Sequence, residues 1–186
     1  MNKSSVQPKL IILDRDGVVN EDSDDYIKSV EEWIPIPGSI EAICELSKAG
    51  YVIAIATNQS GIGRGFYHLE TLHAMHEKME NLVKSGGGHI QGVYYCPHLP
   101  DEGCDCRKPD IGLIRQIEES TGLSAVGAPF VGDSISDIDA AQKAQCQPIL
   151  VRSGKGERTL KKLAENHGIP VFTNLLAYTQ HLLHRN

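Results

Sequence analysis

Short apolar runs alternate with segments of helical periodicity along the chain, and this alternation restricts the possible folds more than any other feature. Residues 9–13 (K-L-I-I-L) form a continuous apolar run of the length expected for a strand buried on both faces. Residues 69–84 have helical spacing and are followed by three glycines that stop a helix. Because strands and helices alternate, we expect a parallel sheet with helices on both faces. The sequence thus predicts a single doubly wound, Rossmann-like α/β domain over residues 1–186.

The same patterns give the order of the elements. We expect the first helix to have Ser39 as its N-cap and to end at Gly50, and we expect Gly122 to end a later helix. The expected strands lie at residues 9–13, 51–56, 90–95, 129–132, 148–151 and 170–173. The other expected helices lie at residues 69–84, 111–121, 135–143 and 157–166, with a final helix that ends near His184.

Composition and charge exclude several classes of protein. The chain is 40% hydrophobic and 23% charged, and its longest apolar runs are far too short to span a bilayer. Residues 1–9 are polar, unlike a signal peptide, and the five cysteines are an odd number. We therefore expect a cytoplasmic protein with reduced thiols and no membrane segment. The formal net charge of −6 argues against general nucleic-acid binding.

Asp14 and Asp16 directly follow the first expected strand and lead into Gly17. In a doubly wound sheet, ligands bind beyond the carboxyl ends of the strands, so this is where chemistry is expected. Two carboxylates held together are costly unless a cation or a shared proton compensates them. Mg²⁺ binds carboxylate and carbonyl oxygens as well as substrate phosphate, so it fits this position. The alternative is a solvated turn, since Asp and Gly are ordinary turn residues.

A polar, glycine-rich run follows the second expected strand, with Thr57, Asn58, Gln59 and Ser60 ahead of residues 61–65. The hydroxyl, amide and backbone N–H groups of this run predict an anion site. Arg64 would add a contact to a phosphate or orient a sugar hydroxyl. The alternative is a flexible connection, because glycine loops alone are weak signals.

A basic pair, Arg107 and Lys108, comes after the third expected strand. A lysine beside the aspartates would neutralise phosphoryl charge and support an ionised nucleophile. The alternative is an ordinary basic pair on the surface.

Asp133 and Asp137 follow the fourth expected strand. Another carboxylate at this edge would complete a magnesium site with Asp14. The alternative is helix capping by Ser134 or Ser136, with Asp137 favourable near the helix N-terminus, and both interpretations can hold together. Each of these signals is modest alone, but their occurrence at four successive strand ends predicts an active site.

The cysteines cluster within one loop. Its potential ligands follow the spacing C-x-H-x5-C-x-C and are Cys96, His98, Cys104 and Cys106. Three thiolates and one imidazole suit a closed, tetrahedral, structural Zn²⁺ site. The alternative is a set of redox-active or merely buried thiols. We expect Cys44 and Cys146 to lie in the core.

The chain resembles the haloacid dehalogenase (HAD) superfamily of phosphatases. The motifs that carry the resemblance are Asp14-Arg15-Asp16-Gly17-Val18, Thr57, Lys108, and Asp133 with Asp137, in this order. The resemblance implies that Asp14 attacks phosphorus and becomes an aspartyl-phosphate, while Asp16 acts as general acid and then general base. Thr57 and Lys108 would hold the phosphoryl oxygens. Asp14, the backbone carbonyl of Asp16, and Asp133 would bind Mg²⁺.

The cysteine loop narrows the resemblance to one branch of the superfamily, which contains heptose 1,7-bisphosphate 7-phosphatases and histidinol-phosphate phosphatases. Val19-Asn20 and Tyr26 resemble the heptose enzymes more closely, although the acidic residues 21–25 depart from their shorter turn. Those enzymes supply heptose for lipopolysaccharide or surface glycans. The expected substrate-binding residues are Asp22, Asp25, Asn58, Gln59, Ser60, Arg64 and Arg107.

Only short loops separate the motifs, so we expect no large cap domain and a monomer that acts on a small phosphorylated sugar. Histidinol phosphate or another small phosphomonoester is the alternative substrate. A related branch that hydrolyses 3′-phosphates on DNA is disfavoured by the acidic charge and the lack of an aromatic, basic strip. A zinc-stabilised binding module without catalysis is a further alternative, but it would not need three aspartates at two strand ends.

Overall fold

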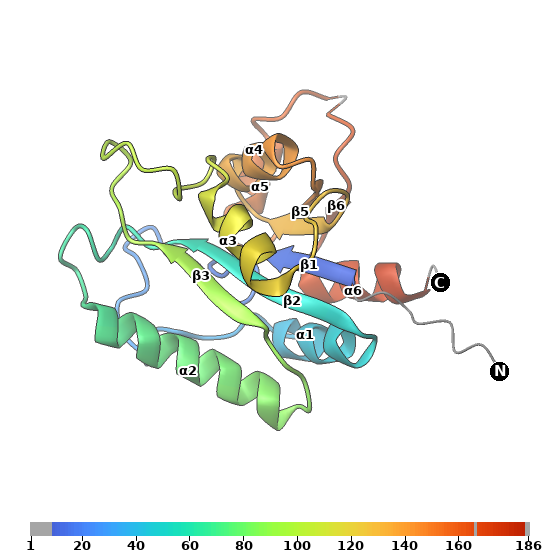
Figure 1. The fold of residues 1–186 in the computed structure, drawn as a ribbon, viewed down its shortest axis with the longest axis horizontal. Helices are drawn as coiled ribbons and strands as arrows, with labels where there is room; N and C mark the ends of the chain where they lie inside the picture. Colours follow the sequence, from blue (N-terminus) through green and yellow to red (C-terminus); the bar gives the residue numbers. More distant parts are fainter. Residues whose placement is uncertain (1–8, 166, 185–186) are drawn as a thin grey trace.

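The computed structural model describes residues 9–165 and 167–184, and its six strands form one parallel sheet (Figure 1). The strands are β1 (Lys9–Leu13), β2 (Tyr51–Asn58), β3 (Gly92–Cys96), β4 (Pro129–Gly132), β5 (Gln147–Val151) and β6 (Val171–Phe172). Their order is β3-β2-β1-β4-β5-β6, so the chain reverses its direction of winding between β1 and β4. This is the doubly wound arrangement predicted from the sequence, with its ligand-binding edge at the β1–β4 boundary.

Helices cover both faces of the sheet, as the alternation of elements predicted. One face carries α1 (Ser39–Lys48), α2 (Leu69–Ser85) and α6 (Leu175–His184), and the other carries α3 (Gly112–Thr121), α4 (Ile135–Lys143) and α5 (Gly156–Leu160) (Figure 1). Successive residues of β1 divide between the two cores: Ile11 and Leu13 pack on the first, Leu10 and Ile12 on the second. Burial of each such side chain contributes about 1.5–3 kcal/mol.

Two details of the helices differ from expectation. Ser39 is not the N-cap of α1; Gly38 occupies that position with a φ of 84°, and the Ser39 hydroxyl donates a hydrogen bond of 2.6 Å to the Val19 carbonyl. The start of α1 is therefore tied to the loop after β1. The helix expected over residues 157–166 is shorter in the structure, spanning Gly156–Leu160, and its only buried residues are Gly156 and Thr159.

Loops cover the carboxyl edge of the sheet in the described part of the chain, and no second domain lies over it (Figure 1). The longest are residues 14–38, between β1 and α1, and residues 97–111, between β3 and α3. None of the described helices is long and apolar enough to cross a membrane. The expectations about residues 1–8 and about Asn166 lie outside the described residues.

Candidate active site

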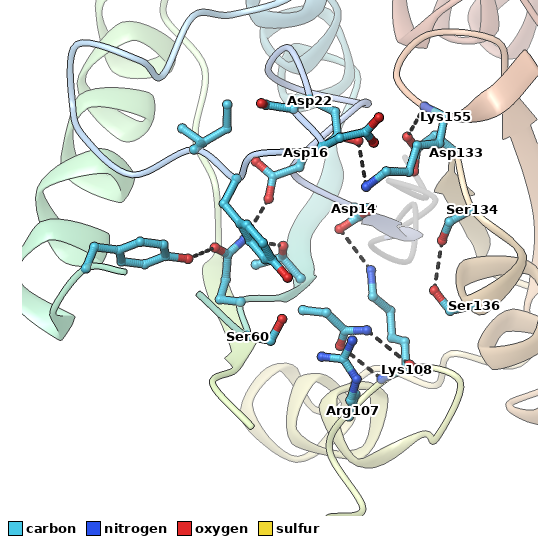
Figure 2. A pocket seen from close by; sticks show the side chains of 18 residues that line it. Asp14, Asp16, Asp22, Ser60, Arg107, Lys108, Asp133, Ser134, Ser136 and Lys155 are labelled. Carbon is cyan, nitrogen blue, oxygen red and sulfur yellow. Dashed lines mark hydrogen bonds and ion pairs between the residues drawn. The ribbon is translucent and has the colours of Figure 1, made fainter. Parts of the chain in front are cut away.

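A cavity of about 380 Å³ opens at the carboxyl edge, where β1 and β4 meet (Figure 2). Most of the residues expected to carry chemistry line it. These are Asp14, Asp16, Asp22, Thr57, Asn58, Gln59, Ser60, Arg107, Lys108 and Asp133. The fold thus brings the four sequence clusters together, because the carboxyl ends of neighbouring parallel strands meet at one edge.

Three carboxylates, those of Asp14, Asp133 and Asp137, lie within 4.8 Å of one another and form what we call the carboxylate cluster. Lys108 is inserted among them: its ammonium lies 2.8 Å from Asp14 and 2.6 Å from Asp137, and it donates to the Ala56 carbonyl at 2.7 Å. Figure 2 shows the Lys108 side chain extended toward Asp14. Burial lowers the pKa of Lys108, but Asp137 and Asp14 outweigh that effect and raise it. Lys108 is therefore a permanent cation here.

One lysine does not neutralise three buried carboxylates. Burial, with repulsion from Asp137, raises the pKa of Asp14 to about 7, and burial with the same neighbour also raises the pKa of Asp133. Asp137 is already engaged by Lys108 and by the N–H groups of Asp133 and Ser134. Asp14 and Asp133 are left with excess negative charge, which a divalent cation would relieve. Buried oxygen donors with uncompensated charge fit Mg²⁺.

Two glycines allow Asp133 to reach this position. Gly17 has a φ of 84° and Gly154 a φ of 57°, both in the left-handed region. A Cβ on either residue would overlap the Asp133 carboxylate. The Lys155 backbone N–H donates to the same carboxylate at 2.6 Å. Glycine at these two positions thus combines a required backbone conformation with a close approach.

The helix-capping interpretation of Ser134 is also correct. Ser134 is the N-cap of α4 and forms a capping box with Asp137. The capping box orients Asp137, whose other oxygen faces Lys108. A structural cap and an active-site contact therefore share one side chain.

Asp16 is held by several donors. Arg15 donates to its Oδ1 at 2.8 Å, Asn20 to Oδ1 at 2.8 Å, and Gln59 to Oδ2 at 2.7 Å. Burial raises the pKa of Asp16, but the Arg15 charge and these hydrogen bonds together hold it below the ordinary value. These contacts favour the ionised form of the carboxylate, which points into the cavity (Figure 2).

The polar residues that follow β2 lie on one wall. Thr57 and Ser60 are buried and line the cavity there. The Asn58 amide pairs with the backbone of Lys108, donating to its carbonyl and accepting from its N–H, each at 3.0 Å. Asn58 lines the cavity, and its amide also fixes the backbone of the lysine.

Two expected substrate contacts lie apart from this cavity. Asp25 is exposed, and Arg64 is exposed with its guanidinium 5.9 Å from the centre of the Tyr26 ring. The glycine run does not cradle the cavity either: the N–H groups of Gly63 and Arg64 donate to the carbonyls of Pro97 and Ser60. The loop after β2 folds on itself and onto the cysteine loop, so its later amides are already used.

Sequence reasoning missed Lys155 and Tyr67, which also line the cavity. Lys155 follows β5, a fifth strand end to which the same rule applied, and its ammonium lies 2.9 Å from Asp22 (Figure 2). A second acidic residue, Asp24, forms a bidentate pair with Arg158 at 2.9 Å. Two residues of the unusual acidic segment 21–25, Asp22 and Asp24, therefore face a basic segment after β5, which no local pattern could reveal.

The four ligands predicted in the cysteine loop converge into what we call the thiol cluster. Cys96 Sγ lies 3.6 Å from Cys104 Sγ and 3.5 Å from His98 Nδ1, which is 3.3 Å from Cys106 Sγ. Donors about one tetrahedral Zn²⁺ would be separated by roughly 3.5–3.8 Å, given bond lengths near 2.0–2.3 Å. The donor set and its spacing therefore fit zinc. Cys44 and Cys146 are buried in the core, as predicted.

The thiol cluster is connected to the cavity through Arg107. Its backbone N–H donates to Cys104 Sγ, and its guanidinium donates to the His98 carbonyl at 3.2 Å. Arg107 is followed directly by Lys108. The cysteine loop therefore contacts one cavity cation, Arg107, and leads directly to the other, Lys108.

Comparisons with known proteins agree with this geometry. A family model described as HAD-hydrolase-like matches residues 105–177. The D-glycero-beta-D-manno-heptose-1,7-bisphosphate 7-phosphatase of Pseudomonas aeruginosa is 57% identical over 175 residues, which are 94% of this chain and 97% of that protein. The crystal structure of D,D-heptose 1,7-bisphosphate phosphatase from B. bronchiseptica, complexed with magnesium and phosphate, has a TM-score of 0.92 and 46% identity, covering 96% of this chain and 99% of that one.

A second solved enzyme of this kind, from Burkholderia thailandensis, is 36% identical with a TM-score of 0.73, covering 94% of this chain and 98% of that chain. The similarity extends over nearly the whole length of each protein, and it includes both the fold and the cavity-bearing loops. This chain therefore belongs to the D-glycero-β-D-manno-heptose-1,7-bisphosphate 7-phosphatase family of HAD-like hydrolases.

Proposed function

We propose that this protein removes the 7-phosphate of D-glycero-D-manno-heptose 1,7-bisphosphate in a reaction that depends on Mg²⁺. The observation that carries the proposal is the convergence of Asp14, Asp16, Lys108 and Asp133 in one cavity of a chain that belongs to this family. The product would enter the supply of heptose for lipopolysaccharide or surface glycans.

Asp14 is the nucleophile in this proposal. One of its carboxylate oxygens attacks the phosphorus of the 7-phosphate, and the bond from phosphorus to the sugar oxygen breaks. Lys108, 2.8 Å from Asp14, favours the ionised carboxylate and stabilises the charge on the phosphoryl oxygens. The buried Thr57 hydroxyl lies on the same wall and would donate to a phosphoryl oxygen.

Asp16 is the proposed general acid and general base. In its protonated form it donates a proton to the departing sugar oxygen, which leaves as an alcohol, and the resulting carboxylate later takes a proton from the water that attacks the aspartyl-phosphate. That attack releases inorganic phosphate and restores the Asp14 carboxylate. The donors around Asp16 favour its ionised form, which is the form that accepts the proton from water.

Asp14 and Asp133, with the backbone carbonyl of Asp16, are the proposed holders of Mg²⁺. When bound, the ion would neutralise carboxylate and phosphate charge and so favour in-line transfer. Zn²⁺ is proposed for the thiol cluster in a structural role, since four protein donors leave no open position.

The remaining proposed substrate contacts come from loops around the cavity. Arg107 and Asp22 line it with Asn58, Gln59 and Ser60, and Lys155 adds a cation on the Asp22 side. Asp25 and Arg64, further from the cavity, stay as predictions. We also propose a cytoplasmic monomer, consistent with thiol ligands that require a reducing compartment; light scattering on purified protein would test the monomer.

The decisive experiment is release of phosphate from D-glycero-D-manno-heptose 1,7-bisphosphate and from histidinol phosphate, measured as kcat/KM. Each substrate is assayed with Mg²⁺ and after dialysis that removes Mg²⁺ while mass spectrometry verifies retained Zn²⁺. A strong Mg²⁺-dependent preference for the heptose supports the proposal. A preference for histidinol phosphate would support the proposed mechanism but refute the proposed substrate.

A further inference from the structure

Asp16 is surrounded by buried polar side chains to which the proposed chemistry gives no part. Arg15 is 0% exposed, and His76 and Tyr67 are each 6% exposed. They come from the loop after β1, from the middle of α2, and from the turn before α2. Burying a guanidinium and an imidazole is costly unless their N–H groups and ring nitrogens have partners.

The guanidinium of Arg15 has a partner on each side. Its Nε and Nη2 donate to Asp16 Oδ1 at 3.1 and 2.8 Å, and Nη2 also lies 3.0 Å from Oδ2. Its Nη1 faces His76 Nε2 at 3.3 Å. Because a guanidinium stays protonated, His76 Nε2 must accept, which requires a neutral ring with its proton on Nδ1.

The surroundings of His76 agree with a neutral ring. Burial, followed by the charge of Arg15, lowers the pKa of His76 to about 3; Asp16 acts in the opposite direction and His73 in the same direction. His76 therefore contacts one side of the Arg15 guanidinium, and the other side of the guanidinium binds Asp16.

A second path to Asp16 runs through Gln59. Its Nε2 donates to Asp16 Oδ2 at 2.7 Å and to Thr57 Oγ1 at 2.8 Å. Its Oε1 accepts from the Tyr67 hydroxyl at 2.6 Å and from Arg15 Nη2 at 3.2 Å. The amide of Gln59 is thus saturated on both sides, and the Tyr67 hydroxyl fixes which side faces Asp16.

We propose that His76 and Tyr67 are positioning residues for Asp16, His76 acting through Arg15 and Tyr67 through Gln59. The inference rests on the proposed function, in which Asp16 gives a proton to the departing sugar oxygen. A small displacement of Asp16 weakens that transfer, because proton transfer requires hydrogen-bond distance. Asp14 itself is held by Lys108 and by the Arg15 backbone N–H. The network touches the proposed phosphoryl site through the hydrogen bond from Gln59 to Thr57, so we expect its effect on attack at phosphorus to be the smaller one.

The test compares two leaving groups through kcat/KM, which includes departure of the alcohol. The sugar oxygen of the heptose substrate needs a proton, whereas the phenolate of 4-nitrophenyl phosphate leaves without one. We expect His76→Leu to lower kcat/KM on the sugar phosphate by about tenfold or more and on 4-nitrophenyl phosphate by less than about threefold. His76→Gln, whose side-chain oxygen can accept from Arg15, should recover most of the loss.

Matched variants complete the design. His89→Leu makes the same change at an exposed histidine between α2 and β3 and should leave both substrates unaffected. Tyr67→Phe removes one hydroxyl and almost no volume, so it tests the second path even if His76→Leu does not fold. We expect a selective loss of about threefold to tenfold on the sugar phosphate.

Equal losses on the two substrates in folded His76→Leu and Tyr67→Phe would overturn the inference, because they would indicate a purely structural role. Asp16→Asn shows whether only the positioning inference fails or whether the assignment of Asp16 as the general acid fails as well. If Asp16→Asn shows the leaving-group selectivity and the two network variants do not, only the positioning inference fails. If Asp16→Asn lacks the selectivity, the assigned acid is wrong, and the proposed function and this inference both fall.

Discussion

The carboxylate cluster and the thiol cluster lie at the same edge of the sheet but are built in opposite ways. The carboxylate cluster joins Asp14 after β1 to Asp133 and Asp137 after β4, residues far apart in sequence. The thiol cluster comes from a single loop, residues 96–106. The first consists of hard oxygen donors, and two of them, Asp14 and Asp133, line the cavity; none of the four thiol-cluster residues lines that cavity.

Because of this difference, a metal ion would have a different role in each of the two clusters. In the carboxylate cluster the charge is uncompensated, so a cation there changes the electrostatics that a reaction would need. In the thiol cluster the four donors lie close together in one loop, so a bound cation would stabilise the conformation of that loop. Arg107 and Lys108 join the two, because the thiol cluster fixes Arg107 and the next residue pairs with Asp14.

The largest expected difference between the two clusters comes from removing the Asp14 carboxylate. We expect Asp14→Asn to lower kcat by about 10⁴-fold or more, since removing a covalent nucleophile leaves only binding and charge stabilisation. The fold should be retained, as measured by circular dichroism. Asp110→Asn, at an exposed position, is the matched control and should retain full activity. Full activity in Asp14→Asn would show that the nucleophile lies elsewhere.

Removing the Zn²⁺ proposed for the thiol cluster should act on stability first. A chelator that strips Zn²⁺, or Cys106→Ser, should lower the unfolding free energy by several kcal/mol and Tm by about 10 °C, at roughly 2–4 °C per kcal/mol. Activity should fall with it, because the loop presents Lys108. Removing Mg²⁺ alone should abolish activity with a much smaller change in Tm. An unchanged melt in a sample shown to be free of metal would contradict the structural role.

Replacing Lys108 tests how much its positive charge stabilises the carboxylate cluster. Lys108→Met should lower the free energy of unfolding by about 3–5 kcal/mol without Mg²⁺, because it leaves buried carboxylates unpaired. Added Mg²⁺ should recover part of this loss. Lys143→Met, which removes a half-exposed ion pair with Asp110, should cost less than about 1 kcal/mol. Chemical denaturation of the two variants, with and without Mg²⁺, gives the comparison.

The smallest expected effect is on the pH dependence of stability. Because the pKa of Asp14 is raised to about 7 in the folded protein, folding without Mg²⁺ favours the protonated form. This contribution is fully present below the ordinary pKa near 3.8 and is lost as pH rises through about 7. The gain in stability from Mg²⁺ should therefore grow between pH 5 and 8, by at most about 1.4 kcal/mol per pH unit.

Asp14→Asn should flatten this pH dependence, while the stability conferred by Zn²⁺ should be the same in both proteins. Thermal melts at matched pH and metal concentration measure both quantities. A magnesium effect that does not change with pH would show that Asp14 does not carry the excess charge.

Much of this protein follows from local sequence. The strands and helices were predicted in type and order because hydrophobic periodicity depends on neighbouring residues, and the thiol cluster was predicted because its four ligands share one loop. The positions of Asp14, Thr57, Lys108 and Asp133 at the cavity follow from one topological rule applied to strand ends.

Other features were decided only when distant segments met. Lys155 faces Asp22, Gly154 makes room for Asp133, and His76 reaches Arg15 across the gap between α2 and the loop after β1. Arg64 and Asp25 do not line the cavity, although Arg64 lies over the ring of Tyr26, which does. Periodicity and spacing describe contacts along the chain, whereas these contacts join residues brought together by the packing of separate elements, and only the tertiary structure fixes which side chains share a buried space.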